Sequence, residues 1–557
     1  MPIKSLYEMC QIQTIAYLKE GLWDNCKIHC PDCRLGIVDG LIHLILQYMH
    51  SADVPSYRCL FHLFTSHQLQ RLDLCWYEEN TMNILLDEAR SETSSASIKN
   101  FNPNTLLKIE KKETSLLLRR LSKDHCSNLR SFIMLQDLCV SKSAIKSLIW
   151  ASRNLTEVHS IINFDLNILQ KCKNLQILKI HIQEKDFEVY FGRKENFLSS
   201  LINLEEFAVC DISLECFDVY PIISKILIHC PKLTSVGLFD SSMAIKHLKT
   251  KKNHAENFKL KSCFWGIQLD NISQSASIKS RSIKSDYKSN FPEIIRIATT
   301  SCPDVEELVI QVFHKDSLQH LTLLKRLNFL CLDFSFCDDF DIDMFISLLG
   351  EIGHQLKHLL VKGFAKGFAP VRLQIDDILR YCPNVESLRI HGPSAINHSE
   401  ETSESLQRLK RLVINCIEFD DLMQILQNCV NLTELFVTFP SRLNESDLIE
   451  SLPQISLWNL RMLCVLGCKF SGTTLKMLLE MFPRLERLHV TEAFEYNLMV
   501  HPFLLRCSAN DLNLRVEIDP FQCWQIWSLI PCPFVRFAVH PVHLNIRHSY
   551  PIAVVSY

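Results

Sequence analysis

A short hydrophobic motif recurs along most of the chain and limits its possible folds more than any other feature. The motif has the form Leu/Val-x-x-Leu-x-Leu/Ile/Val, as in LQILKI from Leu175, VEELVI from Val305 and LTELFV from Leu432. Its copies begin at Leu129, Leu155, Leu175, Leu204, Leu233, Val305, Leu327, Leu356, Val385, Leu409, Leu432, Leu460 and Leu485. The last two apolar positions alternate as on a short strand, and one such unit cannot bury its apolar side alone. The sequence therefore predicts that successive units stack into a repeat array.

A helical segment with an N-terminal cap follows the strand motif, as where Asp420 and Asp421 precede LMQILQNC. Apart from one long gap between Leu233 and Val305, the copies recur at the 20 to 29 residues typical of leucine-rich repeats. The pattern resembles the cysteine-containing class of leucine-rich repeats known from substrate receptors of ubiquitin ligases. This resemblance implies an α/β solenoid with parallel strands on its concave face and helices outside.

Many of the 24 cysteines follow the same repeat. Six of them occupy one position shortly before a strand motif: Cys126, Cys172, Cys230, Cys302, Cys382 and Cys429. A free cysteine packs as a small apolar side chain, whereas disulfide scaffolds are typical of much shorter chains. We therefore predict reduced, buried thiols at these positions.

Composition and charge disfavour several classes of function. The 557 residues are 47% hydrophobic and carry a net charge of -3, so a continuous core is available and no global field attracts nucleic acid. No apolar run reaches the roughly 18 residues of a membrane span, and the N-terminus lacks the pattern of a secretory signal. We expect a cytoplasmic or nuclear protein with no membrane partner.

Changes in composition divide the chain into four parts. Residues 1–62 are predicted to form a small all-α adaptor-binding unit, 63–120 a junction with a first repeat-like strand in HQLQRLDL, 121–515 the solenoid, and 516–557 a C-terminal cap. The long gap holds an insertion at 241–290, whose basic, serine-rich sequence predicts a flexible, solvated loop. The alternative is a basic arm for nucleic acid or an acidic partner, and CFWGIQL at 263–269 is a candidate for one degenerate strand inside it.

The N-terminal segment SLYEMCQIQTIAYLKE predicts a helix with Leu6, Met9 and Cys10 on one face. One interpretation is a cap that covers the first repeat. SLYEMC also resembles the elongin-C-binding box, and this resemblance implies that Leu6 enters a pocket of elongin C while Cys10 packs beside it. Met9 and Ile15 complete the predicted adaptor surface.

A second apolar helix, LGIVDGLIHLILQYM from Leu35, follows this segment. In the Zyg-related leucine-rich-repeat receptors, which this arrangement resembles, a cullin box follows the elongin box, so Ile37 and Leu41 are predicted to contact a cullin. The same region is also similar in outline to an F-box, which would join the repeats to an SCF adaptor instead. A plain leucine-rich-repeat interaction scaffold is the third hypothesis.

Motifs that carry catalysis are missing from the sequence. It contains no G-x-x-x-x-G-K-S/T phosphate loop, no G-x-S-x-G elbow and no H-E-x-x-H metal motif. CKIHCPDC at 26–33 holds ligand types that suit zinc but lacks a second ligand pair nearby, and DDFDID at 338–343 is typical of helix capping. We therefore predict a protein that is not an enzyme and that holds no metal or cofactor.

A protein substrate is predicted to bind the concave face, through strand residues that point outward to solvent. Aromatic and arginine side chains are the usual interface anchors. The candidates are Phe329, His358, Arg389, Arg411, Phe436 and His489.

Overall fold

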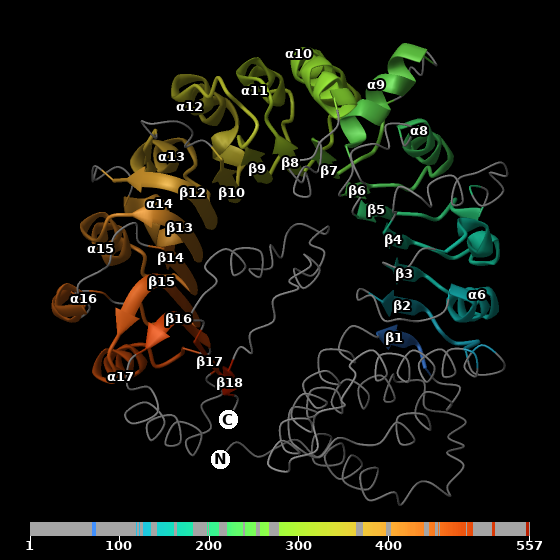
Figure 1. Ribbon diagram of the computed structural model, residues 1–557. Helices are drawn as coiled ribbons and strands as arrows, with labels where there is room; N and C mark the ends of the chain where they lie inside the picture. Colours follow the sequence, from blue (N-terminus) through green and yellow to red (C-terminus); the bar gives the residue numbers. More distant parts are fainter. Residues whose placement is uncertain are drawn as a thin grey trace, which may run out of the picture. The chain divides into compact units, whose positions relative to one another are not determined.

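The computed structural model (Figure 1) describes the repeat region of the chain. Apart from isolated positions, the described residues are 69–73, 126–134, 142–160, 164–181, 201–210, 220–237, 240–251, 257–266, 278–363, 371–396, 403–438, 445–451, 457–485, 487–493, 515–518 and 553–555. They fall into two units, which we call the N-terminal unit (within Pro2–Phe239) and the C-terminal unit (within Asp240–Tyr557). This boundary lies inside the range that the sequence predicted to be one solenoid.

The N-terminal unit is a parallel sheet in which each strand pairs with the next one in the chain. Its strands are β1 (Arg71–Asp73), β2 (Ser131–Met134), β3 (Glu157–Ser160), β4 (Ile177–His181), β5 (Glu206–Cys210) and β6 (Ser235–Gly237). Helix α6 (Lys142–Ala151), the 3-10 helix η3 (Leu166–Lys171) and helix α8 (Tyr220–His229) lie on one side of the strands (Figure 1). Strand β1 confirms the repeat-like strand expected in HQLQRLDL.

The C-terminal unit repeats the same plan over more strands. Its parallel sheet runs through β7 (Ser262–Trp265), β8 (Glu307–Gln311), β9 (Phe329–Asp333), β10 (His358–Lys362), β12 (Ser387–Ala395), β13 (Arg411–Ile417), β14 (Glu434–Thr438), β15 (Met462–Phe470), β16 (Arg487–Ala493) and β17 (Arg515–Ile518). The short β11 (Leu373–Gln374) also pairs with β12, and β18 (Ala553–Val555) is antiparallel to β17.

Helices again occupy one side of this sheet (Figure 1). They are α9 (Ser241–Lys251), α10 (Ile278–Ser301), α11 (Leu318–Leu321), α12 (Ile342–Ile352), α13 (Ile375–Tyr381), α14 (Ser403–Arg408), α15 (Phe419–Asn428), α16 (Glu445–Ser451) and α17 (Gly472–Met481), with 3-10 turns η7 (Lys315–Ser317) and η8 (Gly353–Gln355). The alternation of parallel strands and helices confirms the predicted α/β leucine-rich-repeat fold.

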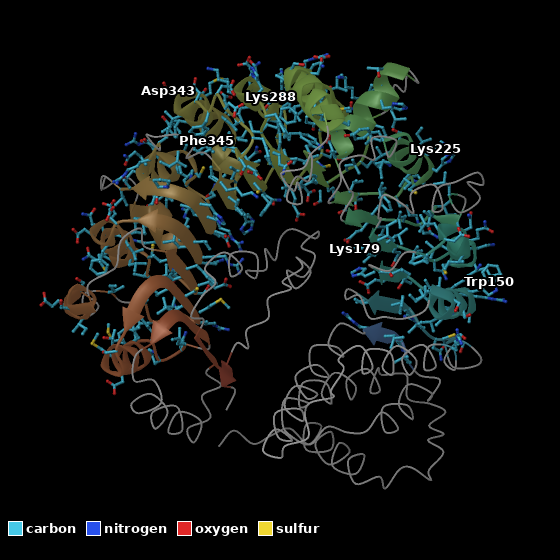
Figure 2. The ribbon with its side chains drawn as sticks, viewed as in Figure 1. Trp150, Lys179, Lys225, Lys288, Asp343 and Phe345 are labelled. Carbon is cyan, nitrogen blue, oxygen red and sulfur yellow. The ribbon has the colours of Figure 1, made fainter. Side chains whose placement is uncertain are left out.

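Helix α12 shows how the local sequence fixes one repeat. The carboxylate of Asp341, in DDFDID, accepts hydrogen bonds from the backbone nitrogens of Asp343 and Met344 at 3.0 and 3.3 Å, and so caps the helix as predicted. Two residues apart on this helix, Asp343 is exposed and Phe345 is fully buried (Figure 2). The apolar side of the helix therefore faces the strands, where the motif leucines are buried.

The cysteines that precede the strands are buried thiols and not disulfides, as the sequence predicted: Cys126, Cys172, Cys230, Cys302, Cys382 and Cys429. Burial raises the pKa of the Cys230 and Cys382 thiols to about 12. A thiol with so high a pKa is protonated at neutral pH and acts as a packing group.

The prediction of a flexible loop at 241–290 is wrong for most of that range. Residues 241–251 form α9, CFW lies in β7 as expected for a degenerate strand, and residues from Ile278 onward form α10. Aromatic packing explains why this segment is folded. The ring of Tyr287 on α10 lies 5.5 Å from the ring of Phe291 and 5.1 Å from the ring of Phe313. The insertion therefore contributes a further repeat to the core.

Candidate protein-binding surface

Residues on the strands of the C-terminal unit alternate between two faces. Leu330 and Leu332 on β9 pair with Leu359 and Val361 on β10, and all four are buried on the side of the helices. The residues between them lie on the opposite face, which we call the helix-distal face. The parallel register places these residues in rows that cross neighbouring strands.

Three rows cross the middle of the helix-distal face. The first row is Phe329, His358, Ser387, Arg411 and Glu434. The second row is Cys331, Leu360, Arg389, Val413 and Phe436. The third row is Asp333, Lys362, His391 and Asn415.

The residues predicted to bind a substrate all lie in the first two rows. Phe329, His358 and Arg411 belong to the first row, and Arg389 and Phe436 to the second. His489 continues the second row through its pairing with Cys464, but its side chain lies outside the described set. The structure thus brings together residues that are far apart in the sequence.

The expectation that these side chains are solvent-exposed is wrong for four of them. Phe329, His358, Arg389 and Phe436 are exposed to only 3%, 8%, 6% and 5%, and Arg411 is half-buried. Strands in a sheet lie about 4.8 Å apart, so a large side chain is covered by its neighbours in the same row. The rings of Phe329 and His358, for example, have centroids 6.3 Å apart.

Arg389 lies at the centre of a group of polar side chains on this face. It pairs with Leu360 on β10 and Val413 on β13, so His358 and Lys362 flank it diagonally on one strand and Arg411 on the other. His391 follows two residues later on the same strand and the same face. We call the group formed by these residues (His358, Lys362, Arg389, His391 and Arg411) the Arg389 centre.

The two histidines of the Arg389 centre both have a lowered pKa, and burial is the largest cause for each. Burial is the largest cause that lowers the pKa of His358, to about 4, and the charges of Arg411 and Arg389 lower it further against the opposing effect of Glu386. For His391, burial and then the charges of Lys362 and Arg389 give a pKa of about 4. Both imidazoles are therefore neutral at pH 7.

Acidic side chains pair with the outer members of the group. The Lys362 ammonium lies 2.9 Å from the carboxylate of Asp333, which is 3% exposed and also accepts a hydrogen bond from the Ser335 nitrogen. Arg411 donates two hydrogen bonds of 2.5 Å to the carboxylate of Glu434. The carboxylates of Asp333 and Glu434 thus lie on the flanks of the Arg389 centre.

Sequence reasoning missed Lys362, His391 and Asp333. The sequence prediction used one position of each strand motif. The register shows that the residue directly after each motif also lies on the helix-distal face. This position was readable in LLVK and LRIH, because strand side chains alternate with a period of two.

The N-terminal unit has a second polar region on its strands. The carboxylate of Glu157 accepts a hydrogen bond from the Ser131 hydroxyl at 2.5 Å and lies 3.2 Å from Nε2 of His159. The bond to His159 is the largest cause that lowers the pKa of Glu157 to about 2. A groove of about 340 Å³ at the starts of β2 and β3 is lined by Gln70, Asn128, Arg130, Asn154, Thr156 and Asn174.

Several sequence predictions fall outside the described residues. These are the adaptor residues Leu6, Met9, Cys10, Ile15, Ile37 and Leu41, and the CKIHCPDC segment. In the part of the chain that the structure describes, no three His, Cys, Asp or Glu side chains are grouped to hold a metal ion. Among the same residues, no helix combines the length and hydropathy needed to span a membrane.

Comparisons with known proteins give only distant likenesses. No family model and no curated protein matches the sequence. A chain of the Rad7–Elc1 complex of yeast is similar at 14% identity and a TM-score of 0.36, over 74% of this chain and 94% of that one. A chain of the TLR13–ssRNA13 complex has 13% identity and a TM-score of 0.29, over 72% and 63%.

A chain of the Toll–Spätzle complex of Drosophila is similar at 12% identity and a TM-score of 0.28, over 62% of this chain and 45% of that one. All three TM-scores are below 0.5, so these likenesses do not assign the chain to a family. The rows of the helix-distal face and the N-terminal motif are the features that bear on function.

Proposed function

We propose that this chain is a non-catalytic substrate-recognition subunit of a cullin-RING ubiquitin ligase. In this proposal the helix-distal face of the C-terminal unit binds a protein substrate. The N-terminal segment with Leu6 and Cys10, which the sequence predicts to be helical, binds elongin B/C. Ubiquitin transfer would be carried out by recruited partners, and this chain would supply proximity and orientation.

One structural observation carries the substrate-binding half of the proposal. Phe329, Arg389 and Phe436, all interface-prone residue types, occupy consecutive rows on one face of a rigid sheet, although 107 positions separate the first from the last. The helices cover the other face, so a partner that contacts the strands meets the helix-distal face. On this face the three side chains are largely covered by their neighbours, whereas Lys362 is 39% exposed. A sheet of ten or so strands is also rigid enough to hold its side chains in fixed positions.

The adaptor half of the proposal rests on the sequence motif SLYEMC and on the apolar segment around Leu41 that follows it. It does not rest on the likeness to the Rad7–Elc1 complex, because a TM-score of 0.36 is too low to carry that argument. The alternatives remain an F-box arrangement that binds an SCF adaptor and a plain interaction scaffold with a capping helix. The three hypotheses differ in which adaptor accompanies the chain.

The test is quantitative mass spectrometry of proteins recovered with the tagged full-length chain from cells. We expect elongin B, elongin C and a cullin in near-equal amounts, and their loss from the variant Leu6→Ser plus Cys10→Ser. The matched control is Glu8→Ser plus Gln11→Ser, which changes other positions of the same predicted helix and should keep all three partners. Recovery of the SCF adaptor in place of elongin would establish the F-box alternative, and recovery of neither would leave the scaffold.

A further inference from the structure

The groove at the strand starts of the N-terminal unit has the chemistry of a second binding site. We infer that this groove binds an extended, acidic segment of a protein partner, whose backbone contacts the asparagine side chains while one carboxylate pairs with Arg130. The proposed function places the substrate on the C-terminal unit, so this inference goes beyond it and does not depend on it.

Four consecutive repeats supply the lining of the groove. Gln70, Arg130 and Thr156 lie side by side on neighbouring strands, because the Arg130 nitrogen donates to the Gln70 oxygen and the Thr156 nitrogen to the Arg130 oxygen, both at 2.8 Å. Asn154 and Asn174 lie in the turns that precede β3 and β4. The volume of about 340 Å³ is near the lower end of the range for ligand sites, so it suits a short segment of chain.

A ladder of asparagines runs through the turns before the strands, and it is interrupted at the groove. The side-chain nitrogens of four of them donate to a backbone oxygen of the preceding turn at 2.6 to 2.9 Å: Asn154, Asn203, Asn384 and Asn431. Within the described residues, the Asn174 side chain makes no such bond. Asn174 therefore keeps a donor and an acceptor for a ligand, and Asn154 keeps its acceptor oxygen. A peptide backbone offers the complementary C=O and N–H groups.

The charged side chains at this edge of the sheet favour an anionic ligand. Arg130 is exposed, and among the residues that the structure describes its guanidinium forms no ion pair. Arg153 and Lys173, which directly precede Asn154 and Asn174, are also exposed and form no ion pair within the same described set. An arginine whose donors are available can bind a carboxylate through two parallel hydrogen bonds. The neighbouring cations add a field of the same sign.

The lining favours a peptide over a nucleic acid. One of its six side chains is charged and none is aromatic, whereas proteins that hold single-stranded nucleic acid combine several cations with aromatic rings on which the bases stack. The carboxylate of Glu157, which directly follows the groove residue Thr156, already contacts Ser131 and His159. The groove thus offers one site for an anion beside several sites for backbone groups.

The experiment selects dodecapeptides from a displayed random library on the immobilised full-length chain. The library is first depleted on the variant Arg130→Gln plus Asn174→Ala, which removes peptides that bind elsewhere on the chain. The matched control is Lys146→Gln, which removes one exposed positive charge from α6, outside the groove lining. Circular dichroism compares the fold of every variant with that of the wild-type chain, and fluorescence anisotropy measures the affinity of each selected peptide.

We expect the selected peptides to carry Asp or Glu at a fixed position. Their affinity should fall about tenfold or more in Arg130→Gln, about threefold in Asn174→Ala, and stay unchanged in Lys146→Gln. A neutral amide in place of the fixed acid of the peptide should weaken binding to the wild-type chain by a similar factor. The same peptide change should have little effect on binding to Arg130→Gln, because both changes remove one contact.

Selected peptides without a fixed acidic residue, or equal affinity for folded Arg130→Gln, would overturn the inference. Recovery of no peptide after depletion would also overturn it, because the groove would then not bind a short acidic segment. Displacement of the selected peptides by single-stranded oligothymidine would assign the groove to nucleic acid instead. The elongin experiment decides the proposed function separately, so a failure of either experiment leaves the other standing.

Discussion

The buried hydrogen bond between Tyr287 and Asp240 should stabilise the contact between α10 and α9 to an extent that depends on pH. One oxygen of the Asp240 carboxyl accepts a hydrogen bond from the Tyr287 hydroxyl at 2.7 Å, and the other accepts from the backbone nitrogen of Ser242 at 3.0 Å. These bonds tie α10 to the start of α9, inside the range expected to be a flexible loop. The variant Tyr287→Phe removes only the bond between the two helices.

The magnitude follows from the charge of the carboxyl. Burial is the largest cause that raises the pKa of Asp240 from 3.8 to about 6, although its hydrogen bonds act in the opposite direction. Since the folded pKa exceeds the unfolded one, this group stabilises the fold most below pH 3.8, and that stability is lost as the pH rises through 6. At pH 8 the bond to the carboxylate is worth about 2 kcal/mol, whereas at pH 5 the bond to the neutral acid is worth about 1 kcal/mol.

Hydrogen exchange measured by mass spectrometry reports the opening of α9 directly. If that opening breaks the Asp240–Tyr287 bond, Tyr287→Phe should speed exchange of the α9 amides about 30-fold at pH 8 and about fivefold at pH 5, each relative to wild type at the same pH. Tyr381→Phe, on the exposed side of α13, is the matched control and should change neither rate. If Tyr287→Phe speeds exchange equally at both pH values, or does not speed it, Asp240 is not a buried carboxyl that ionises between pH 5 and pH 8.

Three further predictions concern single positions of the repeats. At Gly363, φ is +77° and an added Cβ would meet the backbone nitrogen of Ser335 at 2.3 Å, so Gly363→Ala should lower the free energy of unfolding by about 2 kcal/mol. At Gly350 in α12 an added Cβ would make an ordinary contact of 3.9 Å with the Tyr381 ring, so Gly350→Ala should raise the free energy of unfolding by about 0.5 to 1 kcal/mol. Thermal unfolding should rank the two variants in this order. The Cys302 thiol, fully buried and with its pKa raised by burial, should resist iodoacetamide at pH 8 until the chain is denatured, and labelling of the native chain would contradict its placement. Glu157, whose pKa is lowered to about 2, contributes stability that is lost only as the pH falls below 4.5. His159→Ala should therefore move the acid unfolding of the N-terminal unit to higher pH in a circular-dichroism titration. An unmoved midpoint would count against the interaction of Glu157 with His159.

The fold was predictable because its determinants are local and repeated. Each copy of the motif carries its own strand pattern and apolar positions, and six copies follow a cysteine, so one correct interpretation applies to every unit. DDFDID was predictable as a cap for the same reason, since Asp341 bonds to nitrogens two and three residues away.

The prediction of a flexible loop at 241–290 was wrong because it followed the composition of the segment and not the spacing of its apolar residues. Its lysines and serines indicated a solvated loop, yet Tyr287, Phe291, Ile294 and Ala298 recur at the spacing of one helical face, and all four are buried. The partner of Tyr287 is Asp240, 47 positions earlier, and the sequence alone gives no sign of that contact.

The candidate site was predictable only in part. The alternation along a strand identifies which side chains share a face, so Arg389 and Arg411 could be chosen from the sequence. Their burial, and the convergence of Lys362 and His391 on Arg389, depend on the register between strands, which is set by the lengths of the intervening helices and loops.

If this chain joins a ligase adaptor to a protein-binding sheet, it should bind purified elongin B/C directly. The measurement is light scattering coupled to size-exclusion chromatography, on the full-length chain mixed with excess elongin B/C. We expect a complex of one chain with one elongin B/C pair, and a free chain for the folded variant Leu6→Ser plus Cys10→Ser. A wild-type chain that is folded by circular dichroism and yet elutes alone would show that it is not a receptor of the elongin type.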